Sequence, residues 1–371
     1  MKIVANGLFL TRPGSGVGQY TRYLLEAYAT AHPRDSLAVV LPEDLSETFP
    51  FETVIAPPPR GNTGGVALDF WERQTIPYIA AELKADVIFS PHVTAPVRTA
   101  IPYVMTVHDV IPWRMPGYQR GLRKKLRAAA QKRGILSADR IITVSEFSKT
   151  EIVSEMGVPR ERIHVAYEST NPEFSRAAAP RAKALARTAF GLERSFIAYV
   201  GGFDPRKNVS TLLRAFADSG IAPQYDLVLM GEPPHDRLYS TYRDIPKHCE
   251  TLGVTESVRR IGFVTESHKH ALLSAAEAVV FPSTYEGFGL PILEGIRAGT
   301  PVIAPDTVLN AELFPQAYHG YPPNQPTALA RLLRSLPLRV PKHAARSAAR
   351  YSWPETSAKV RDALEQAVEK T

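Results

Sequence analysis

The sequence EGFGLPILE (residues 286–294) places two carboxylates, Glu286 and Glu294, on either side of two glycines and a proline. A carboxylate accepts two hydrogen bonds at once, so each glutamate suits a pair of neighbouring hydroxyls on a sugar or a ribose. The glycines lack a Cβ atom and would let a ligand approach the main chain closely. This stretch favours a sugar-nucleotide site. The alternative is that Glu286 is a solvated loop residue and that Glu294 complements a helix N-terminus.

The segments around these glycines predict a strand, a turn and a helix. An apolar, β-branched run at 277–283 indicates a buried strand. The following residues indicate a helix that begins at Pro291 and ends at Gly299, with Glu294 in its first turn. Such a turn points free backbone N–H groups and the positive end of a helix dipole towards an anion. We therefore expect a phosphate to lie near the glycines.

A glycine turn also follows the first predicted strand of each half of the chain. The first turn reads GSGVG (14–18), which differs from the G-x-G-x-x-G of dinucleotide-binding proteins and is a weak signal alone. The second, GGFDPRKN (201–208), carries Arg206 and Lys207, adjacent cations that could neutralise a departing diphosphate. A surface pair at a helix start is the alternative. The sequence contains no Asp-x-Asp pair for a divalent metal, so we expect these cations and helix N-termini to stabilise the charge.

Length and composition favour two cytoplasmic domains. The 371 residues, 44% of them hydrophobic, exceed the usual size of a single domain. The opening MKIVANGLFL is too short and polar for a signal peptide, and no run approaches the roughly 20 apolar residues of a membrane span. The single cysteine, Cys249, cannot form an internal disulfide, which fits a reducing compartment and excludes a cysteine-rich zinc site. The net charge of +7 favours anionic partners.

Positive charge is concentrated in RGLRKKLRAAAQKR (120–133), which has seven basic residues and no acidic one. Three interpretations are open: a solvated helix face, a surface that docks on an anionic membrane, and a nucleic-acid site. The third is disfavoured because no aromatic residues interleave with the charges and no nucleic-acid module is visible. We expect no nucleic-acid partner and treat the helix near Arg123 as a candidate membrane surface.

Strand and helix patterns alternate in both halves, which predicts parallel α/β sheets. The expected strands of the first half are 2–10, 36–43, 85–91, 101–109, 139–146 and 162–168, and those of the second are 195–202, 225–232, 258–264, 277–283 and 299–306. The expected helices are 19–30, the basic stretch, 208–217, 268–278, the segment after Pro291, and the C-terminal segment. The pattern is lost at 169–183, which predicts a linker.

Together and in chain order, GSGVGQY, VHD (107–109), VSEFSK (144–149), GGFDPRKN and EGFGLPILE resemble the retaining family-4 glycosyltransferases of the GT-B fold. The E-x7-E element and the Arg-Lys pair are the specific part of the resemblance. It implies an α/β chain of two facing Rossmann-like domains with parallel sheets. Residues 1–172 would form the acceptor domain, 173–351 the nucleotide-sugar domain, and 352–371 a helix that crosses back to the first domain.

The resemblance also implies an activity. A hexosyl group would pass from a GDP-, UDP- or dTDP-sugar to a hydroxyl of a glycan or lipid-linked acceptor, with retention and without metal or cofactor. The region VHDVIPWRMP (107–116) is most similar to polysaccharide mannosyltransferases, so GDP-mannose is our first expectation. Acceptor loops are expected at 59–73 and 111–121. The protein would be cytoplasmic, with docking at the inner face of a membrane left open.

Individual residues take roles from the same resemblance. Glu294 matches the ribose-binding residue, and Glu286 matches a contact to the hydroxyls of the donor sugar. His108 matches an active-site histidine that leans towards that sugar, and Asp109 would orient His108 or contact the acceptor. Val264 falls where the main chain reads the base. The matches to catalytic residues are His108, Arg206, Lys207 and Glu286, and those to substrate-binding residues are Gly16, Gly18, Asp109, Gly202, Val264, Gly287, Phe288, Gly289, Leu290 and Glu294.

Two departures from the family pattern and three other classes of protein stay open. Asn310 and Ala311 stand where relatives carry a serine-rich turn and proline, which leaves the role of Glu312 open, and AYESTNPEF (166–174) replaces an Asn-Gly turn. A sugar-nucleotide epimerase of similar fold would convert donor without an acceptor, and a non-catalytic sensor would only bind it. A nicotinamide-dependent oxidoreductase would leave Arg206, Lys207 and both glutamates without a role.

Overall fold

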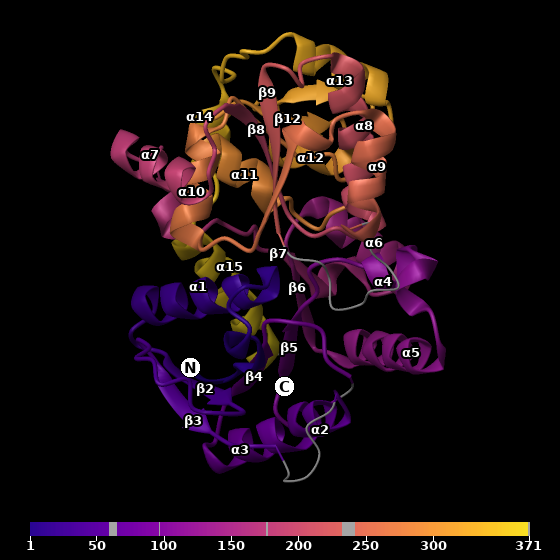
Figure 1. The fold of residues 1–371 in the computed structure, drawn as a ribbon. Coiled ribbons are helices and arrows are strands. Elements are labelled where there is room, and N and C mark those ends of the chain that lie inside the picture. Colours follow the sequence, from indigo (N-terminus) through magenta and orange to yellow (C-terminus); the bar gives the residue numbers. More distant parts are fainter. Residues whose placement is uncertain (59–64, 96, 176, 232–241, 370–371) are drawn as a thin grey trace. The chain divides into compact units, whose positions relative to one another are not determined.

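The chain folds into two compact units (Figure 1). Unit 1 consists of residues 1–169 and 351–371, and unit 2 of residues 170–350. The computed structural model describes residues 1–58, 65–95, 97–175, 177–231 and 242–369. Positions 59–64 of the expected acceptor loop and Glu232 at the end of an expected strand lie outside the described residues. Within those ranges, no helix is long and apolar enough to cross a membrane.

Unit 1 is built on a seven-stranded parallel sheet of order β3-β2-β1-β4-β5-β6-β7. Its strands are β1 (Lys2–Asn6), β2 (Ser36–Leu41), β3 (Glu52–Ile55), β4 (Val87–Ser90), β5 (Tyr103–Thr106), β6 (Arg140–Thr143) and β7 (Ile163–Val165). Every residue of β4 and β5 is buried, as expected of a parallel sheet covered on both faces. The six expected strands are confirmed, but β3 was not predicted, because its polar sequence ETVI is largely exposed.

The helical segments of unit 1 connect these strands. They are η1 (Leu8–Thr11), α1 (Gly16–Ala31), α2 (Gly65–Phe70), the π-helical turn η2 (Trp71–Thr75), α3 (Ile76–Glu82), α4 (Ile111–Arg114), η3 (Pro116–Gln119), α5 (Leu122–Ser137), α6 (Glu146–Met156), η4 (Arg160–Arg162) and α15 (Trp353–Val368). The expected helix in the basic stretch is confirmed as α5. The expected acceptor loops are wrong in part, because 65–73 and much of 111–121 are helical. The first strand ends at Asn6 rather than residue 10.

Unit 2 repeats the plan with a six-stranded parallel sheet of order β10-β9-β8-β11-β12-β13. Its strands are β8 (Ser195–Val200), β9 (Tyr225–Met230), β10 (Val258–Gly262), β11 (Ala278–Val280), β12 (Val302–Pro305) and β13 (His319–Tyr321). The core on one side of this sheet contains Phe216 from α8 and Leu329 from α13, both fully buried. The five expected strands are confirmed, and β13 is an additional edge strand.

Helices cover the sheet of unit 2. They are η5 (Pro172–Ser175), α7 (Pro180–Ala189), η6 (Pro205–Lys207), α8 (Val209–Ser219), η7 (Tyr242–Asp244), α9 (Ile245–Leu252), η8 (Thr255–Ser257), α10 (Glu266–Ala275), α11 (Leu290–Arg297), α12 (Val308–Leu313), α13 (Pro326–Arg334) and α14 (Ala344–Ala348). The predicted linker is wrong in part, because it contains η5 and the start of α7. Glu294 is the fifth residue of α11, outside its first turn, because the left-handed Gly289 (φ 98°) lets the helix begin at Leu290.

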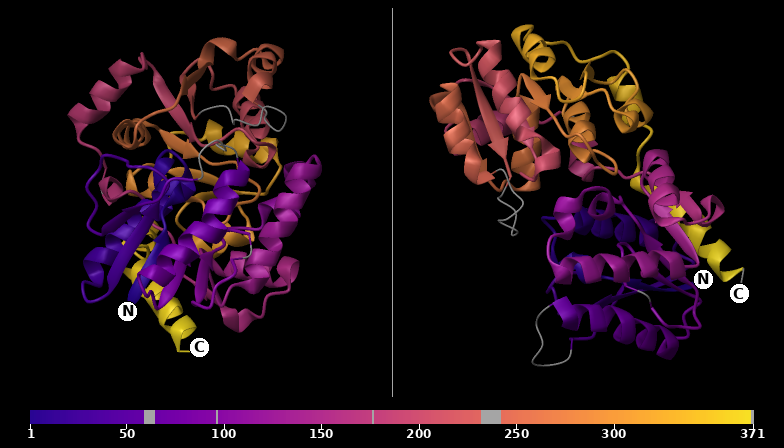
Figure 2. Two further views of the ribbon diagram at one scale, coloured as in Figure 1. Left: turned by 90° about the horizontal axis from the view of Figure 1, so that it is seen from below. Right: turned by 90° about the vertical axis from the view of Figure 1, so that its right-hand side faces the viewer.

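The C-terminal helix α15 packs on unit 1, against α1 (Figure 2). Trp353 is buried, with its ring centroid 5.9 Å from that of Tyr20 on α1. Thr356 Oγ1 donates to the carbonyl of Tyr167 at 2.6 Å. Where the chain enters and leaves unit 1, Ser169 Oγ donates to the carbonyl of Tyr351 at 3.2 Å. The expectation that the last helix returns to the first half of the chain is confirmed.

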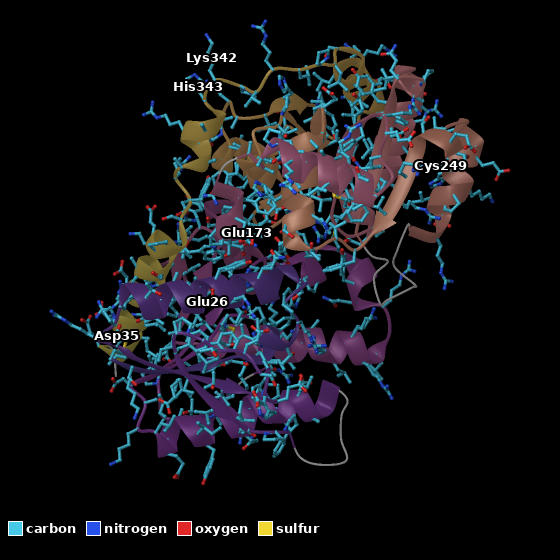
Figure 3. The ribbon with its side chains drawn as sticks, turned by 60° about the vertical axis from the view of Figure 1, so that its left-hand side comes forward. Glu26, Asp35, Glu173, Cys249, Lys342 and His343 are labelled. Carbon is cyan, nitrogen blue, oxygen red and sulfur yellow. The ribbon has the colours of Figure 1, made fainter. Side chains whose placement is uncertain are left out.

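A buried carboxylate, Asp35, links α15 to the N-terminal end of the sheet (Figure 3). Its Oδ1 lies 3.0 Å from the N-terminal ammonium group of Met1, and its Oδ2 accepts hydrogen bonds from Arg361 Nε on α15 and from the Tyr28 hydroxyl, both at 2.8 Å. Burial would raise the pKa of Asp35, but these three donors outweigh it and lower the pKa to about 2. The charged form of Asp35 therefore stabilises the fold.

We expect Asp35→Asn to destabilise unit 1 at pH 7. A fall in the pKa from 3.8 to about 2 corresponds to about 2 kcal/mol of stability, present above pH 4 and lost as the pH falls from about 4 to 2. Urea unfolding at pH 7 and at pH 3 measures this difference. Asp362→Asn, on the exposed side of the same helix, is the matched control and should change stability by less than about 0.5 kcal/mol. Equal stability of wild type and Asp35→Asn at pH 7 would contradict this account.

Candidate active site

The predicted phosphate-binding and sugar-binding residues of unit 2 meet at the reversal of its strand order. β8 pairs with β9 on one side and β11 on the other, so the loops after β8 and β11 diverge from one point of the sheet. Such a reversal is where open α/β sheets bind ligands, outside the carboxyl ends of the strands. Three hydrogen bonds to the carbonyl of Arg206 join the loops, from Thr284 N–H at 2.9 Å, Thr284 Oγ1 at 3.2 Å and Ser283 Oγ at 3.3 Å.

Glu286 occupies the centre of this cluster. Its Oε2 lies 2.5 Å from Arg206 Nη1, and its Oε1 lies 2.6 Å from Lys207 Nζ and 2.5 Å from Ser283 Oγ. The side chains of Arg206, Lys207 and Glu286 are only 11–15% exposed. The structure therefore brings together the three residues of unit 2 that the sequence singled out for catalysis.

Electrostatics keep the Glu286 carboxyl group ionised. Burial raises its pKa, but Lys207 and Arg206 outweigh that effect and lower the pKa to about 2. Burial also lowers the pKa of Lys207, and Glu286 offsets this shift only in part because Arg206 adds a second positive charge. Asp204 pairs with Arg206 Nε at 3.1 Å. The cluster thus balances two cations against two carboxylates in a poorly solvated site, where an added phosphate or a sugar hydroxyl would find charged partners of either sign.

The backbone beside Glu286 is fixed by the start of α11. Gly289 has a left-handed backbone that a residue with a Cβ adopts only with strain, which explains glycine here. Phe288 is buried, with its ring centroid 6.1 Å from that of Phe314, and it holds Gly287 in a buried position next to Glu286. Leu290 is the first residue of α11. Gly202 lies in the loop after β8, where an added Cβ would meet Asp204 Oδ2 at 3.5 Å, an ordinary contact.

Glu294, the predicted ribose-binding residue, is only 3% exposed. Lys269 Nζ on α10 donates to its Oε1 at 2.7 Å and lies 3.0 Å from Glu266. Burial raises the pKa of Glu294, and Lys269 offsets that effect only in part. Sequence reasoning missed Lys269, because a lysine in the middle of a predicted helix gives no signal of burial.

Two further sequence candidates lie on other elements of unit 2. Val264 follows β10 and is 8% exposed, whereas its neighbour Phe263 is 57% exposed. Glu312 lies on α12, where the buried Asn310 donates from Nδ2 to the carbonyl of Pro305 at 2.8 Å. That bond gives Asn310 a role in joining α12 to the end of β12. The roles assigned to Val264 and Glu312 stay predictions.

In unit 1, His108 follows the buried strand β5 and is bonded at both ring nitrogens. Nδ1 lies 2.7 Å from Glu168 Oε1, and Nε2 lies 3.0 Å from the carbonyl of Pro91. Both partners are acceptors, so these contacts favour the protonated ring, which donates from both nitrogens. Burial lowers the pKa of His108, but the hydrogen bond to Glu168 and the charge of that carboxylate outweigh it, and the pKa is raised. Sequence reasoning missed Glu168, which lies 60 residues away in the chain.

Asp109 and the first glycine turn have mainly local contacts. Asp109 Oδ1 accepts from the backbone N–H of Ile111 at 2.9 Å and so fixes the start of α4. Gly16 is the first residue of α1, and an added Cβ there would meet no atom within 4 Å. At Gly18, an added Cβ would lie 2.1 Å from the carbonyl oxygen of Arg12. Gly18 is therefore required by packing, whereas Gly16 leaves the backbone accessible.

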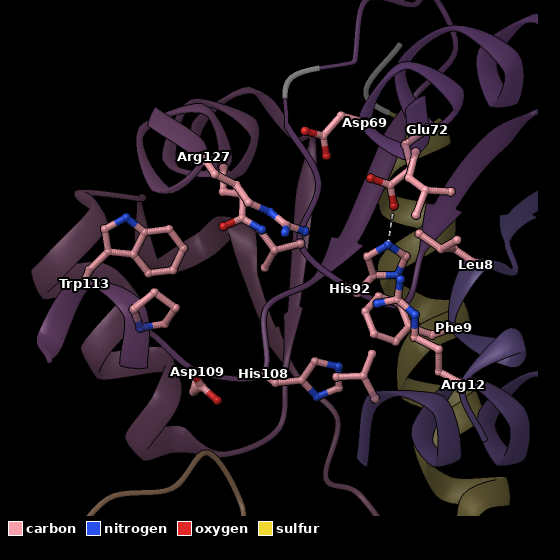
Figure 4. Close-up of a pocket in the computed structure, with 15 residues that line it drawn as sticks. Leu8, Phe9, Arg12, Asp69, Glu72, His92, His108, Asp109, Trp113 and Arg127 are labelled. Carbon is pink, nitrogen blue, oxygen red and sulfur yellow. Dashed lines mark hydrogen bonds and ion pairs between the residues drawn. The ribbon is translucent and has the colours of Figure 1, made fainter. Parts of the chain in front are cut away.

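His108 and Asp109 line a pocket of about 270 Å³ in unit 1 (Figure 4). The other lining residues are Leu8, Phe9, Arg12, Val17, Leu68, Asp69, Glu72, His92, Val93, Pro112, Trp113, Arg127 and Gln131. Several of these residues are charged or aromatic, and no motif in the sequence indicated that they would line one pocket. Across the parts of the chain that the structure describes, no cluster of three or more His, Cys, Asp or Glu side chains is arranged to hold a metal ion.

Comparison with known proteins finds a family match in each half of the chain. "Glycosyltransferase Family 4" matches residues 14–174, and "Glycosyl transferases group 1" matches residues 181–350. The O-antigen chain mannosyltransferase B of Escherichia coli is 26% identical over 355 residues, which are 91% of each chain. The D-inositol 3-phosphate glycosyltransferase of Salinispora arenicola is 30% identical over 283 residues, 70% of this chain and 62% of that protein. The chain thus spans less than two thirds of the second relative.

Solved structures show the same fold. A sucrose-phosphate synthase from Thermosynechococcus elongatus aligns over 100% of both chains with a TM-score of 0.75 and 20% identity. Anabaena HepE, in complex with UDP and glucose, aligns over 99% of this chain and all of that one with a TM-score of 0.73 and 18% identity. The fold is GT-B, and the protein is a glycosyltransferase. The chain belongs to the family-4 glycosyltransferases.

We expect Glu168→Gln to lower the pKa of His108, because the neutral amide removes the charge that opposes the effect of burial. In wild type the raised pKa stabilises the fold below pH 6.5, and this contribution is lost as the pH rises through the pKa of folded His108. The variant should lose that pH dependence. Titration of the His108 ring by NMR measures the pKa directly. Glu161→Gln, at an exposed position, is the control. An unchanged His108 pKa in Glu168→Gln would show that Glu168 is not what raises it.

Proposed function

We propose that this glycosyltransferase moves a hexosyl group, with mannose the first candidate, from a nucleotide diphosphate sugar to a hydroxyl of a glycan or lipid-linked acceptor, and that the anomeric configuration is retained. The observation that carries the proposal is Glu286 held between Arg206 and Lys207 at the strand reversal of unit 2. Mannose is supported by the similarity to an O-antigen mannosyltransferase over 91% of both chains. The proposed donor nucleotide is GDP, with UDP and dTDP as alternatives.

Unit 2 would bind the donor. Arg206 and Lys207 would stabilise the diphosphate as charge accumulates on the leaving oxygen, and Glu286 would accept hydroxyl protons of the sugar in hydrogen bonds. Glu294 would accept hydrogen bonds from the two ribose hydroxyls. Lys269 would hold the Glu294 carboxylate in position through its hydrogen bond to Oε1. This chemistry needs no cofactor, and the charge stabilisation that a metal supplies elsewhere is assigned to the two cations.

The proposed step is a substitution on one face of the sugar. The bond between C1 and the leaving phosphate oxygen breaks, the acceptor oxygen bonds to C1, and the acceptor proton passes to the departing phosphate. Glu286 is a poor candidate for a covalent nucleophile, because two cations hold its pKa at about 2 and so lower its basicity. The chain would contribute orientation and charge stabilisation.

We expect Lys207→Ala to lower the transfer rate by roughly 10²-fold or more, because it removes a preorganised partner of the developing phosphate charge. The measurement follows GDP-mannose, UDP-glucose and dTDP-glucose with alkyl glycoside acceptors by NMR, with and without EDTA. Wild type should give product of unchanged anomeric configuration in EDTA. Lys247→Ala, at an exposed position on α9, is the matched control.

Three outcomes would overturn parts of the proposal. A transfer rate of Lys207→Ala near that of wild type removes Lys207 from the mechanism. Inverted product excludes retention. Conversion of donor to an isomer without any acceptor favours the epimerase alternative, and donor binding without turnover favours the non-catalytic one.

We also propose that the enzyme is cytoplasmic and that α5 docks it on the inner face of an anionic membrane, where a lipid-linked acceptor would lie. Leu122 and Leu126 are 72% and 62% exposed, and their spacing of four residues places them on one face of the helix. Arg123, Lys124 and Lys125 beside them are exposed as well. Exposed leucines among basic side chains suit an interface of acyl chains and anionic headgroups better than water.

We expect wild type to bind vesicles that contain phosphatidylglycerol, and to bind pure phosphatidylcholine vesicles much more weakly. Removing Arg123 and Lys124 by Gln substitution should weaken binding by roughly 30-fold, at about 1 kcal/mol for each charge. Leu122→Ser with Leu126→Ser should weaken binding also at high salt, where the charge term is screened. Leu185→Ser, at a 61% exposed leucine of unit 2, is the control. Equal sedimentation of all variants with both vesicles would exclude α5 as the docking surface.

A further inference from the structure

A buried glutamate in unit 1 lies on a π-helical turn that the proposed chemistry does not use. Residues 65–82 form one helical stretch whose middle, Trp71–Thr75, is π-helical. Trp71 is fully buried there, and its indole N–H donates to the carbonyl of Ala56 at 2.5 Å. Glu72 is only 7% exposed. π-helical turns occur frequently at functional sites, because the extra residue redirects a side chain.

The partners of Glu72 lie at the strand reversal of unit 1. β1 pairs with β2 and β4, so this reversal is the counterpart of the one that holds Glu286 in unit 2. Asn6, the last residue of β1, donates from Nδ2 to Glu72 Oε1 at 3.1 Å. His92, just beyond β4, has its Nε2 at 2.5 Å from the same oxygen (Figure 4). Ligands bind at such reversals in open α/β sheets.

The contacts of His92 favour one tautomer of its ring. Nε2 lies 2.5 Å from Glu72 Oε1 and 3.4 Å from Asn6 Nδ2, and the shorter contact to the carboxylate favours a proton on Nε2. In this tautomer, Nδ1 has a free lone pair. His92 Nδ1 is buried and has no hydrogen-bond partner in the described ranges of the chain. A buried acceptor without a donor is unfavourable, which is a reason to look for the missing donor in a ligand.

The surroundings of Nδ1 are part of the pocket. The half-buried ring of Phe9 lies edge-to-face against the His92 ring, with centroids 4.5 Å apart. The Arg12 guanidinium lies 5.4 Å from the Phe9 centroid. Both residues follow β1 on a short turn and line the pocket. Phe9, Arg12 and His92 therefore form one part of the pocket wall.

The opposite side of the pocket indicates what kind of ligand fits. Trp113 lies across from His92 in Figure 4 and offers an aromatic face. Burial raises the pKa of Asp69, and the positive charge of Arg127 partly offsets this shift, so these two lining residues interact electrostatically. The volume of about 270 Å³ lies near the lower end of small-molecule sites, about 300 Å³. Aromatic and hydrogen-bonding walls of this size suit one uncharged pyranose unit.

We propose that His92 Nδ1 accepts a hydrogen bond from a hydroxyl of the acceptor sugar in this pocket, with Glu72 as the positioning residue that fixes the imidazole tautomer. This inference rests on the proposed glycosyl transfer, because only that reaction makes the bound sugar an acceptor. The pocket and the unpaired Nδ1 atom are independent of the donor site. Phe9 moves aside when the sugar enters, and the Trp113 ring covers the apolar face of the pyranose.

Two substitutions at His92 separate the roles of its nitrogens. The amide of asparagine reaches the position of Nδ1, whereas that of glutamine reaches the position of Nε2. His92→Asn therefore keeps an acceptor for the sugar, and His92→Gln keeps only the donor to Glu72. Glu72→Gln removes the carboxylate that fixes the tautomer. His164→Gln is the matched control, because His164 lies on β7 and also has a buried, unpaired nitrogen.

The probes are the methyl α-glycosides of mannose, glucose and galactose, with binding measured by saturation-transfer NMR. We expect wild type and His164→Gln to bind at least one glycoside equally. His92→Gln and Glu72→Gln should weaken that binding about tenfold, the effect of about 1.4 kcal/mol, and His92→Asn should weaken it less. In transfer assays the acceptor KM should rise while the donor KM and hydrolysis of donor by water stay unchanged.

The outcomes distinguish the two proposals. If glycoside binding depends on His92 but wild type transfers sugar from no donor, the proposed function is overturned and the proposed sugar site is retained. Transfer by wild type with the same acceptor affinity in His92→Gln would overturn the site alone. Absence of glycoside binding to wild type would also overturn it. Thermal unfolding of each variant identifies a loss of binding that arises from a loss of fold.

Discussion

The reversal of strand order in each parallel sheet is the constraint on which both candidate sites depend. At β1/β4 and at β8/β11, neighbouring strands send their connections to opposite faces, and this leaves the carboxyl ends of both strands uncovered. Loops from distant parts of the sequence then meet there without crossing the sheet. Unit 2 uses this position for Glu286 and its two cations, and unit 1 uses it for Asn6, Glu72 and His92.

Buried carboxylates connect segments that lie far apart in the sequence. Glu286 joins the loop after β8 to the loop after β11, and Glu168 joins the end of β7 to His108 after β5. Asp35 does the same for the first strand and α15. A buried carboxylate with several donors specifies one arrangement, because any other leaves a charge without partners in a poorly solvated site. These carboxylates therefore position the side chains of the candidate sites and also favour the native arrangement of the segments that they join.

The sequence revealed the features that are local and missed those that depend on tertiary contacts. The strands, the basic helix and the cluster of Arg206, Lys207 and Glu286 follow from apolar runs, glycine turns and a family resemblance. Lys269, Glu168 and the pair of Glu72 and His92 were missed, because each becomes significant only through a partner at least 20 residues away. Glu294 was expected in the first turn of its helix, and a left-handed glycine that no periodicity reveals moved that start by one residue.

The hydrogen bond between Ser169 and Tyr351 has a consequence for how this enzyme is organised. The chain leaves unit 1 and re-enters it at adjacent points, so in topological terms unit 2 is a 181-residue domain inserted into a loop of unit 1. The sheet and the last helix of unit 1 therefore form one compact unit, in which the two points of the chain that flank the insert are neighbours. A direct peptide connection from Ser169 to Tyr351 would yield a minimal form of unit 1, and exchange of the insert would yield chimaeric chains in which the two candidate sites come from different proteins.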